Sequence, residues 1–179
     1  MKSMQIAIDG PSGAGKSTMA KLISQKLGIM YLDTGAMYRT LALKAIRLNI
    51  DTQDSNKVTE LLSDFNISIQ YENGSQKVIL NHEDVSYKIR SDEVSMGASN
   101  VSAIPAVRKR LVELQQEMAS NTSVVMDGRD IGTHVLPNAD VKIFLTASVA
   151  QRALRRYNEQ KEKGILKKSL DEIEKEIEI

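Results

Sequence analysis

Cysteine is absent from the 179-residue sequence, and an excess of charge of either sign is nearly absent as well. Without cysteine the chain can form neither a disulfide nor a thiolate metal site. The formal net charge is only +1, so no overall field attracts the protein to nucleic acid, and any cationic binding must be local. No apolar run approaches the roughly 18 residues that a membrane span needs. No signal-peptide core precedes the first strand-like segment either, so we expect a cytoplasmic protein.

The composition that remains is that of a soluble globular protein. Hydrophobic residues make up 41% of the chain and charged residues 26%, which places it outside the disordered class. A length of 179 residues is most simply a single domain that is large enough to bury a core.

One stretch near the N-terminus organises the chain. A short apolar run ends at Asp9, a G-x-x-x-x-G-K-S pattern follows, and apolar residues then recur at helical spacing. Strand, glycine loop and helix in this order predict a phosphate-binding loop, because converging N–H groups and the positive helix end attract phosphate. A glycine-rich turn without phosphate is the alternative, and this context disfavours it. We therefore predict that ATP binds to Gly10, Pro11, Ser12, Gly13, Ala14, Gly15, Lys16, Ser17 and Thr18.

The end of this loop has the chemistry to hold a triphosphate and its metal ion. Lys16 can reach the β- and γ-phosphates, and the Ser17 hydroxyl can ligate Mg²⁺. Asp127 follows another apolar strand, at a position where a carboxylate meets Mg²⁺ directly or through water. Taken alone, Asp127 and Gly128 are better explained as an ordinary turn. The phosphate-loop pattern earlier in the chain reverses that preference.

The spacing of apolar residues predicts alternating strands and helices. Helices are expected at 16–27, from 36 to 48, from Pro105, from 148 to 164 and from Ser169 onward, with strands at 29–32, 123–126 and 141–145. Residues 65–71 and 76–80 indicate a hairpin around Asn73-Gly74, with a third small strand near 84–86. A short helix is expected within 51–63, whereas the polar stretch 92–102 favours no single element.

This alternation predicts an α/β fold with a parallel sheet covered by helices on both faces and a small inserted antiparallel β subdomain. Ligands in such folds bind at the carboxyl ends of the strands. Gly10, Asp33, Asp127 and Thr146 all follow strand ends. We expect them to share one rim of the sheet.

Five blocks of the chain resemble the bacterial cytidylate kinases, a family of phosphate-loop nucleoside monophosphate kinases. The blocks are residues 8–18, 32–39, 93–94 with 99–108, 126–133 and 141–145, and the run DGRDIGT from Asp127 to Thr133 is highly specific. The resemblance implies transfer of the γ-phosphoryl group of MgATP to CMP or dCMP, giving CDP or dCDP and ADP. It also implies one kinase domain over 1–179, with a core at about 1–50 and 100–150, an inserted monophosphate-binding subdomain at about 51–95 and a lid region at about 150–179.

The same resemblance implies roles for single residues. Lys16 and Arg129 are implied to be catalytic, Arg155 to contact the adenine side of ATP, and Thr34 to contact the cytosine end. The other residues implied to bind CMP are Tyr38, Arg39, Ser99, Arg108, Asp127, Arg129 and Asp130. An arginine near a helix N-terminus, as at Arg39, is either solvated or directed at an anion. The implied partners are small nucleotides, without nucleic acid or membrane, and the implied state is a monomer.

Two features depart from the family pattern. The family's lid continues in a segment that supplies arginines to the reacting phosphates, and this sequence stops at Ile179, where that segment should begin. We expect a protein ending there to be nearly inactive, since such an arginine can contribute a factor of about 10³–10⁵. His134 stands where an apolar residue is usual, and we interpret it as a tolerated loop histidine.

Two other functions stay open at this point. Another small-molecule kinase on the same scaffold, acting on AMP, UMP or shikimate, would share the phosphate loop. A GTP-binding switch would read guanine with Asn-Lys-x-Asp. The nearest match, Asn56-Lys57-Val58-Thr59, lacks the aspartate.

Overall fold

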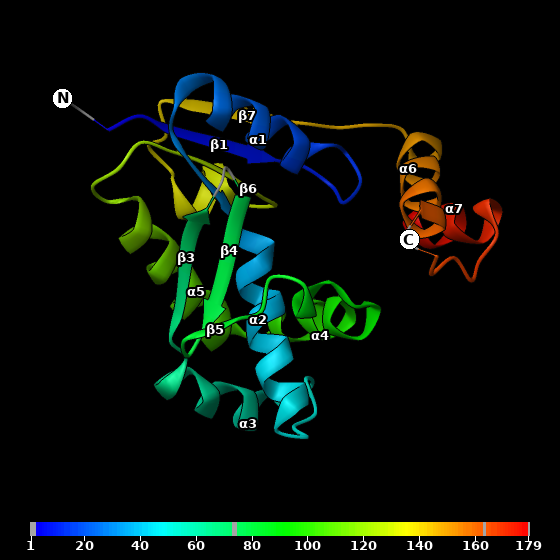
Figure 1. The fold of residues 1–179 in the computed structure, drawn as a ribbon, viewed down its shortest axis with the longest axis horizontal. Helices are drawn as coiled ribbons and strands as arrows, with labels where there is room; N and C mark the ends of the chain where they lie inside the picture. Colours follow the sequence, from blue (N-terminus) through cyan, green and yellow to red (C-terminus); the bar gives the residue numbers. More distant parts are fainter. Residues whose placement is uncertain (1–2, 73–74, 163, 179) are drawn as a thin grey trace.

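Four parallel strands form the central layer of the molecule (Figure 1). The computed structural model describes residues 3–72, 75–162 and 164–178. The strands lie in the order β2-β6-β1-β7, and every neighbouring pair runs parallel, as the sequence predicts. Their bounds are Gln5–Asp9 for β1, Met30–Asp33 for β2, Val124–Gly128 for β6 and Val141–Phe144 for β7.

Side chains of successive strand residues alternate between two apolar clusters. Ile6 and Ile8 of β1 pack in one cluster with Ala20 of α1 (Lys16–Leu27). Ala7, between them, packs in the other cluster with residues of α2 (Thr34–Arg47) and α5 (Pro105–Ala119). This period of two is what a strand buried on both faces requires. The prediction of helices on both faces is therefore confirmed.

The first two helices begin where local chemistry favours it. α1 starts directly after the glycine loop and ends at Leu27, because Gly28 adopts φ 64° and donates its N–H to the carbonyl of Ser24. α2 starts at Thr34, two residues before the predicted Ala36. The side chain of Asp33 accepts from the N–H of Ala36 and so caps the helix as soon as β2 ends.

A small antiparallel sheet is inserted after α2. It has the order β3-β4-β5, with bounds Ile67–Glu72, Ser75–Leu80 and Glu83–Asp84, and it follows α3 (Ser55–Glu60) and a 3₁₀ turn (Leu61–Asp64). The hairpin is thus confirmed, although its predicted Asn73-Gly74 turn lies outside the described residues. The buried Lys44 of α2 donates to the carbonyls of Leu61 and Asp64 and pairs with the Asp64 carboxylate, so it ties the insert to the core.

The polar stretch that favoured no element folds as α4 (Asp92–Ser102), after a short 3₁₀ turn (Lys88–Arg90). Ser91 caps α4 by accepting from the N–H of Val94. The helix packs closely on α2, because a Cβ on Gly97 would stand only 3.2 Å from the Cβ of Ala42. Its buried stripe is Val94, Gly97 and Val101, which has too little apolar character to stand out in the sequence.

Two helices close the described chain, α6 (Val149–Glu162) and α7 (Leu170–Glu178). They pack on each other and stand beside the sheet, at the end of an extended link after β7 (Figure 1). The predicted capping box before α7 is confirmed, because Ser169 donates its N–H to Glu172 and accepts from the N–H of Glu172 in return. The prediction that this helix reaches Ile179 lies outside the described residues. No helix in the described ranges is long and apolar enough to cross a membrane.

Candidate functional site

The glycine loop joins β1 to α1 in a backbone conformation that is unfavourable for residues with a side chain. Gly10 has φ 146°, and a Cβ there would lie 1.9 Å from the carbonyl oxygen of Leu145. Gly15 has φ 100° and stands at the N-cap of α1, so no side chain obstructs the free N–H groups of the first helical turn. The loop of residues 10–17 therefore presents backbone donors and a positive helix end at the carboxyl edge of the sheet.

Lys16 lies over this loop. Its Nζ donates to the carbonyl of Pro11 at 2.9 Å. Burial lowers the pKa of Lys16, the negative charge of Asp127 opposes that shift, and the positive charge of Arg129 adds to it. The ammonium is thus partly desolvated and within electrostatic reach of both Asp127 and Arg129.

Asp127 is a buried carboxylate at the rim with a hydrogen bond to each of its oxygens. One of its oxygens accepts from the hydroxyl of Ser17 at 2.8 Å and the other from the phenol of Tyr31 at 2.8 Å. Burial raises the pKa of Asp127, and the negative charge of Asp33 on the neighbouring strand raises it further. Asp127 lies inside β6, not in a turn beyond it, so the explanation of Asp127 as an ordinary turn residue was wrong.

Asp33 and Arg39 form a second charged group, on the edge strand and the helix after it. The Arg39 guanidinium donates to the Asp33 carboxylate at 2.8 Å, with both side chains largely buried. Of the two alternatives for Arg39, the structure shows an arginine directed at an anion. Arg39 Nε is buried and has no hydrogen-bond partner among the described atoms.

A third charged group lies after β6. Arg108 of α5 forms an ion pair with Asp130. Burial raises the pKa of Tyr38, and the charges of Asp130 and Arg108 act on it in opposite directions, which places the Tyr38 phenol near this pair. Arg129 is exposed at the same segment. Arg108, Arg129, Asp130 and Tyr38, four residues of the predicted CMP site, therefore gather around the turn after β6.

The segment after β6 is bonded to the carboxylate of Asp9. The N–H groups of Ile131 and Gly132, which open a π-helical turn (Ile131–Val135), donate to the two Asp9 oxygens at 2.7 and 2.8 Å. His134 of this turn is exposed, and its Nδ1 lies 2.9 Å from the hydroxyl of Thr133. The role of His134 as a tolerated residue stays an interpretation.

The remaining predicted residues lie around these groups in different ways. Arg155 of α6 donates to the carbonyls of Gly13 and Ala14 at 3.0 and 2.9 Å, so it holds the outer side of the glycine loop. Ser99 is exposed on α4, the helix that packs on α2. Thr34 is buried, and its hydroxyl donates to the carbonyl of Asp127 at 2.8 Å. This geometry favours a structural contact for Thr34 over the implied contact with a base.

The residues at the rim fit a magnesium ion that is shared with a ligand. Mg²⁺ prefers oxygen ligands and is usually bound by one or two carboxylates together with substrate phosphates. The Ser17 hydroxyl and the Asp127 carboxylate supply adjacent oxygens beside the phosphate loop. Among the described residues no group of three or more His, Cys, Asp or Glu could hold a metal, so these residues do not form a metal site built from protein ligands alone.

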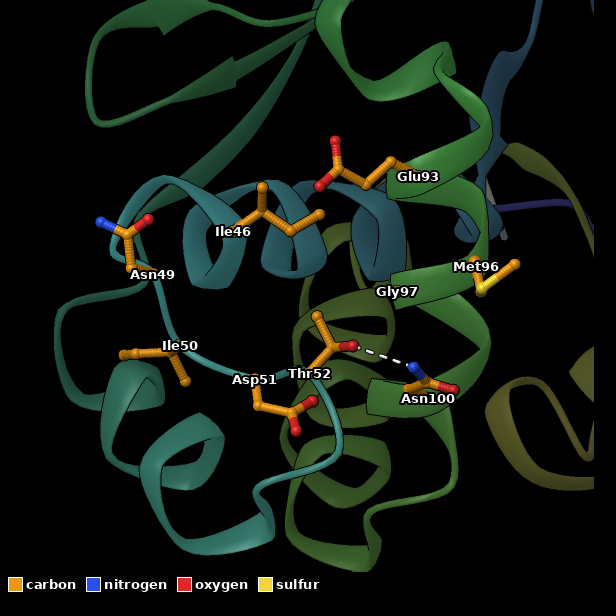
Figure 2. Close-up of a pocket in the computed structure, with 9 residues that line it drawn as sticks. All are labelled: Ile46, Asn49, Ile50, Asp51, Thr52, Glu93, Met96, Gly97 and Asn100. Atoms are coloured by element: carbon orange, nitrogen blue, oxygen red, sulfur yellow. Dashed lines mark hydrogen bonds between the residues drawn. The ribbon is translucent and has the colours of Figure 1, made fainter.

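A cavity of about 470 Å³ lies away from this rim, between the end of α2, the loop that follows it and α4 (Figure 2). Asn100 donates to Thr52 at 2.9 Å within it. Its charged lining residues are Asp51 and Glu93, and none of the described residues that line it is basic. Negative charge without a cation disfavours phosphate. None of the predicted site residues lines this cavity.

Three residues of the rim received no role from the sequence. Asp9 and Asp33 were predicted only as strand ends, and Tyr31 only as a buried strand residue. The position of an acidic residue at the carboxyl end of a parallel strand is a signal for the first two. No local pattern points to Tyr31, whose phenol meets Asp127 across 96 positions of the sequence. Burial raises the pKa of Tyr31, so the phenol stays protonated and donates.

Comparison with known proteins gives one consistent result. A family model described as cytidylate kinase matches residues 6–179. The cytidylate kinase of Caldicellulosiruptor bescii is 54% identical over 178 residues, covering 98% of this chain and 79% of that protein. The cytidylate kinase of Ligilactobacillus salivarius is 53% identical over 177 residues, covering 99% and 79%. The solved structure of TT1252 from Thermus thermophilus is 19% identical with a TM-score of 0.46, covering 97% of this chain and 78% of that one.

Proposed function

The chain belongs to the cytidylate kinase family, and from that premise we propose that it transfers the γ-phosphoryl group of MgATP to CMP or dCMP, giving CDP or dCDP and ADP. The observation that carries most weight is the contact of the segment after β6 with the end of β1: the N–H groups of Ile131 and Gly132 donate to Asp9, directly before the phosphate loop, and Asp130 of the same segment pairs with Arg108. A group that binds the donor phosphates and groups that can bind the acceptor phosphate are thereby neighbours.

On the donor side, the loop residues Gly10 to Thr18 bind the phosphates of ATP. Their N–H groups and the Lys16 ammonium stabilise the charge that develops on the transferred group and on the leaving ADP. Lys16 is already held over the loop and partly desolvated, which strengthens its attraction for phosphate. Arg155 supports the same loop by donating to its carbonyls. Its contact with the adenine side of the nucleotide stays part of the proposal.

On the acceptor side, Arg39, Arg108 and Arg129 neutralise the phosphate of CMP, which would otherwise repel ATP. Arg39 and Arg108 are each oriented by one carboxylate, and a guanidinium has five N–H donors, so both keep donors for a ligand. Tyr38 and Ser99 complete the proposed CMP site, with Asp127 and Asp130 as supporting carboxylates. The attacking phosphate oxygen is already anionic, so the protein needs no general base.

Ser17 and Asp127 are the residues that would hold Mg²⁺. When bound with ATP, the ion supplies positive charge to the β- and γ-phosphates. In this chain Tyr31 and Ser17 orient the two oxygens of Asp127, and Thr34 holds its backbone carbonyl.

The domain division follows from the same proposal. Residues 1–50 and 100–150 form the core, the insert at about 51–95 closes over the monophosphate, and the region at about 150–179 acts as a lid. Closure excludes water, which would otherwise accept the phosphoryl group. We further propose that the protein is a monomer in the cytoplasm. Its partners in this proposal are small nucleotides, and it binds neither nucleic acid nor membrane.

An acceptor panel tests the proposal. The complete gene product is incubated with MgATP and CMP, dCMP, UMP, AMP or shikimate, and ADP release is followed for each. We expect the highest kcat/KM with CMP or dCMP. A preference for AMP, UMP or shikimate would assign the chain another acceptor, and tight GTP binding without any transfer would favour a switch. The Lys16→Ala variant, purified in the same way, controls for contaminating kinases.

A further inference from the structure

Asp9 lies against the chain on both sides of the two-residue segment that carries Arg129 and Asp130. On one side, the backbone of Asp9 pairs with Gly128, where the β1–β6 ladder ends. On the other side, the Asp9 carboxylate accepts from the N–H groups of Ile131 and Gly132 at 2.7 and 2.8 Å. Residues 129 and 130 lie between these two contacts with Asp9. They come after the last residue of β6, so strand pairing does not fix them.

Asp9 also leads directly into the phosphate loop. Its backbone carbonyl accepts from the N–H of Leu145 at 2.7 Å, and the next residue is Gly10, the first of the loop. Asp9 therefore continues directly into the donor-phosphate loop, and its side chain binds the turn that follows Arg129 and Asp130. Two N–H groups on two separate oxygens also fix the plane of the carboxylate, which a single bond would leave free to rotate.

The close approach of the two segments depends on Gly132. A Cβ there would stand 3.2 Å from the Asp9 carboxylate and 3.2 Å from Cδ of Lys142. Both distances are shorter than ordinary van der Waals contact, so a larger residue would push the carboxylate away from the turn. The absence of a side chain at Gly132 thus supports the same contact from the opposite side.

We propose that Asp9 is a positioning residue for phosphoryl transfer: its carboxylate fixes the Arg129–Asp130 segment relative to the phosphate loop, so that the acceptor phosphate meets the donor in one geometry. Asp9 itself touches no substrate in this role. The inference rests on the proposed function, because Arg129 and the Arg108–Asp130 pair are taken as acceptor-site residues. It also explains why a carboxylate stands at the end of β1, where neither Mg²⁺ nor ATP is assigned to it.

The test is Asp9→Asn in the complete gene product. Asparagine keeps one acceptor oxygen and caps helical turns well, so the fold should persist, but its amide nitrogen cannot accept the second N–H. We expect kcat/KM for CMP to fall about 10- to 100-fold, as a small misplacement of aligned groups can cost. KM for MgATP should change less than about twofold, since the loop itself is unaltered. An equal rise in both KM values would mean a general defect of the loop and would overturn the proposal.

Two matched variants separate positioning from structural support. Asp140→Asn alters a carboxylate that accepts from the N–H of Gln5 at 2.9 Å, where β1 begins at the opposite edge of the sheet from the rim, and should leave both KM values unchanged. Gly132→Ala disturbs the Asp9 contact from the other partner and should lower kcat/KM for CMP in the same direction. Should Asp9→Asn fail to fold, judged by circular dichroism, Gly132→Ala decides: unchanged CMP kinetics in a folded Gly132→Ala protein would overturn the proposal.

A double-mutant cycle with Arg129→Ala identifies what Asp9 acts through. If Asp9 works by placing Arg129, adding Asp9→Asn to Arg129→Ala should cost less than about twofold further, because the two changes remove one interaction. Full additivity of the two effects would contradict the inference. A wild-type protein that fails to phosphorylate CMP would instead remove the proposed function, so the two failures are distinguishable.

Discussion

Charged side chains at the phosphate rim and at the junction between the insert and α2 respond to the fold in opposite ways. At the rim, burial raises the pKa of Asp127 and lowers the pKa of Lys16, so the fold disfavours both charges. At the junction, hydrogen bonds from Arg47 and Lys88 hold the pKa of Glu83 at about 2. Arg47 binds that carboxylate with two bonds of 2.7 and 2.9 Å.

The difference indicates which charges help the protein to fold and which serve its chemistry. Glu83 is half-buried and paired, so its charge favours the folded state. Asp127 and Lys16 are desolvated before any ligand arrives, and a nucleotide with its metal ion would supply the opposite charges that they lack. Perturbed pKa values of this kind are common at functional sites. Changes at the rim should therefore affect activity far more than stability, and changes at the junction the reverse.

The largest expected effect is that of Lys16→Ala. Removing the ammonium that faces the transferred phosphate should lower kcat by about 10²–10³-fold or more. The melting temperature should not fall, because the lost group is a partly buried charge with a lowered pKa. Steady-state ADP release and thermal unfolding measure the two quantities. Lys21→Ala, at an exposed position of the same helix, is the matched control and should leave kcat unchanged; equal losses in both variants would remove Lys16 from the mechanism.

Asp127→Asn should separate activity from stability. Activity should fall about 10- to 100-fold with the loss of a carboxylate beside the phosphates. Because the folded-state pKa of Asp127 is raised, its ionised form weakens the fold at pH 7, so the neutral variant should melt at a higher temperature there.

Thermal unfolding of Asp127→Asn and of the wild type over a range of pH tests whether the melting temperature rises for this reason. The gain of Asp127→Asn is expected to shrink as the pH falls through the raised folded-state pKa and to vanish below the unfolded value of about 3.9. Tyr31 and Ser17 can still bond to the amide, because hydroxyl groups both donate and accept. A lower melting temperature at pH 7 would show that the two hydrogen bonds to the carboxylate outweigh its desolvation.

The smallest expected effect is that of Glu83→Gln. The folded-state pKa of Glu83 is depressed to about 2, so the carboxylate contributes stability above its unfolded pKa of about 4.3 and loses it as the pH falls toward 2. Thermal unfolding should show a slightly lower melting temperature at pH 7, and the difference should disappear as the pH falls through about 2. Kinetics with CMP and MgATP should be unchanged. A drop in kcat for Glu83→Gln without a change in melting temperature would contradict the expectation that changes at the junction affect stability and not activity.

Most of the helices and strands could be predicted from the sequence, because their signals are local. The bounds of α1 match the prediction at both ends, since the glycine loop and Gly28 mark them chemically. The missed helix α4 has small and polar residues where an apolar stripe is expected, and it forms because Gly97 lets it approach α2. Propensity and periodicity do not report how closely a neighbouring helix can pack.

The candidate site, too, could be predicted only in part. The phosphate loop and the basic residues were named from motifs, and their roles stay proposals. The contacts that orient them were not foreseen: Tyr31 with Asp127, Asp33 with Arg39, and Asp9 with the turn at 131–132. The hydrogen bond from the Thr34 hydroxyl to the carbonyl of Asp127 is a further contact that the motif did not indicate.

The sequence alone determined the phosphate-binding loop, the alternation of strands and helices and the family, because glycine geometry, apolar period and residue identity act over short stretches of chain. Only the tertiary structure decided which distant residues meet. The strand order β2-β6-β1-β7 brings β6 between β2 and β1, and this places Asp127 against both Ser17 and Tyr31 and lets Asp9 reach the turn after β6. Strand order is set by the packing of all the layers together, so no local pattern specifies it.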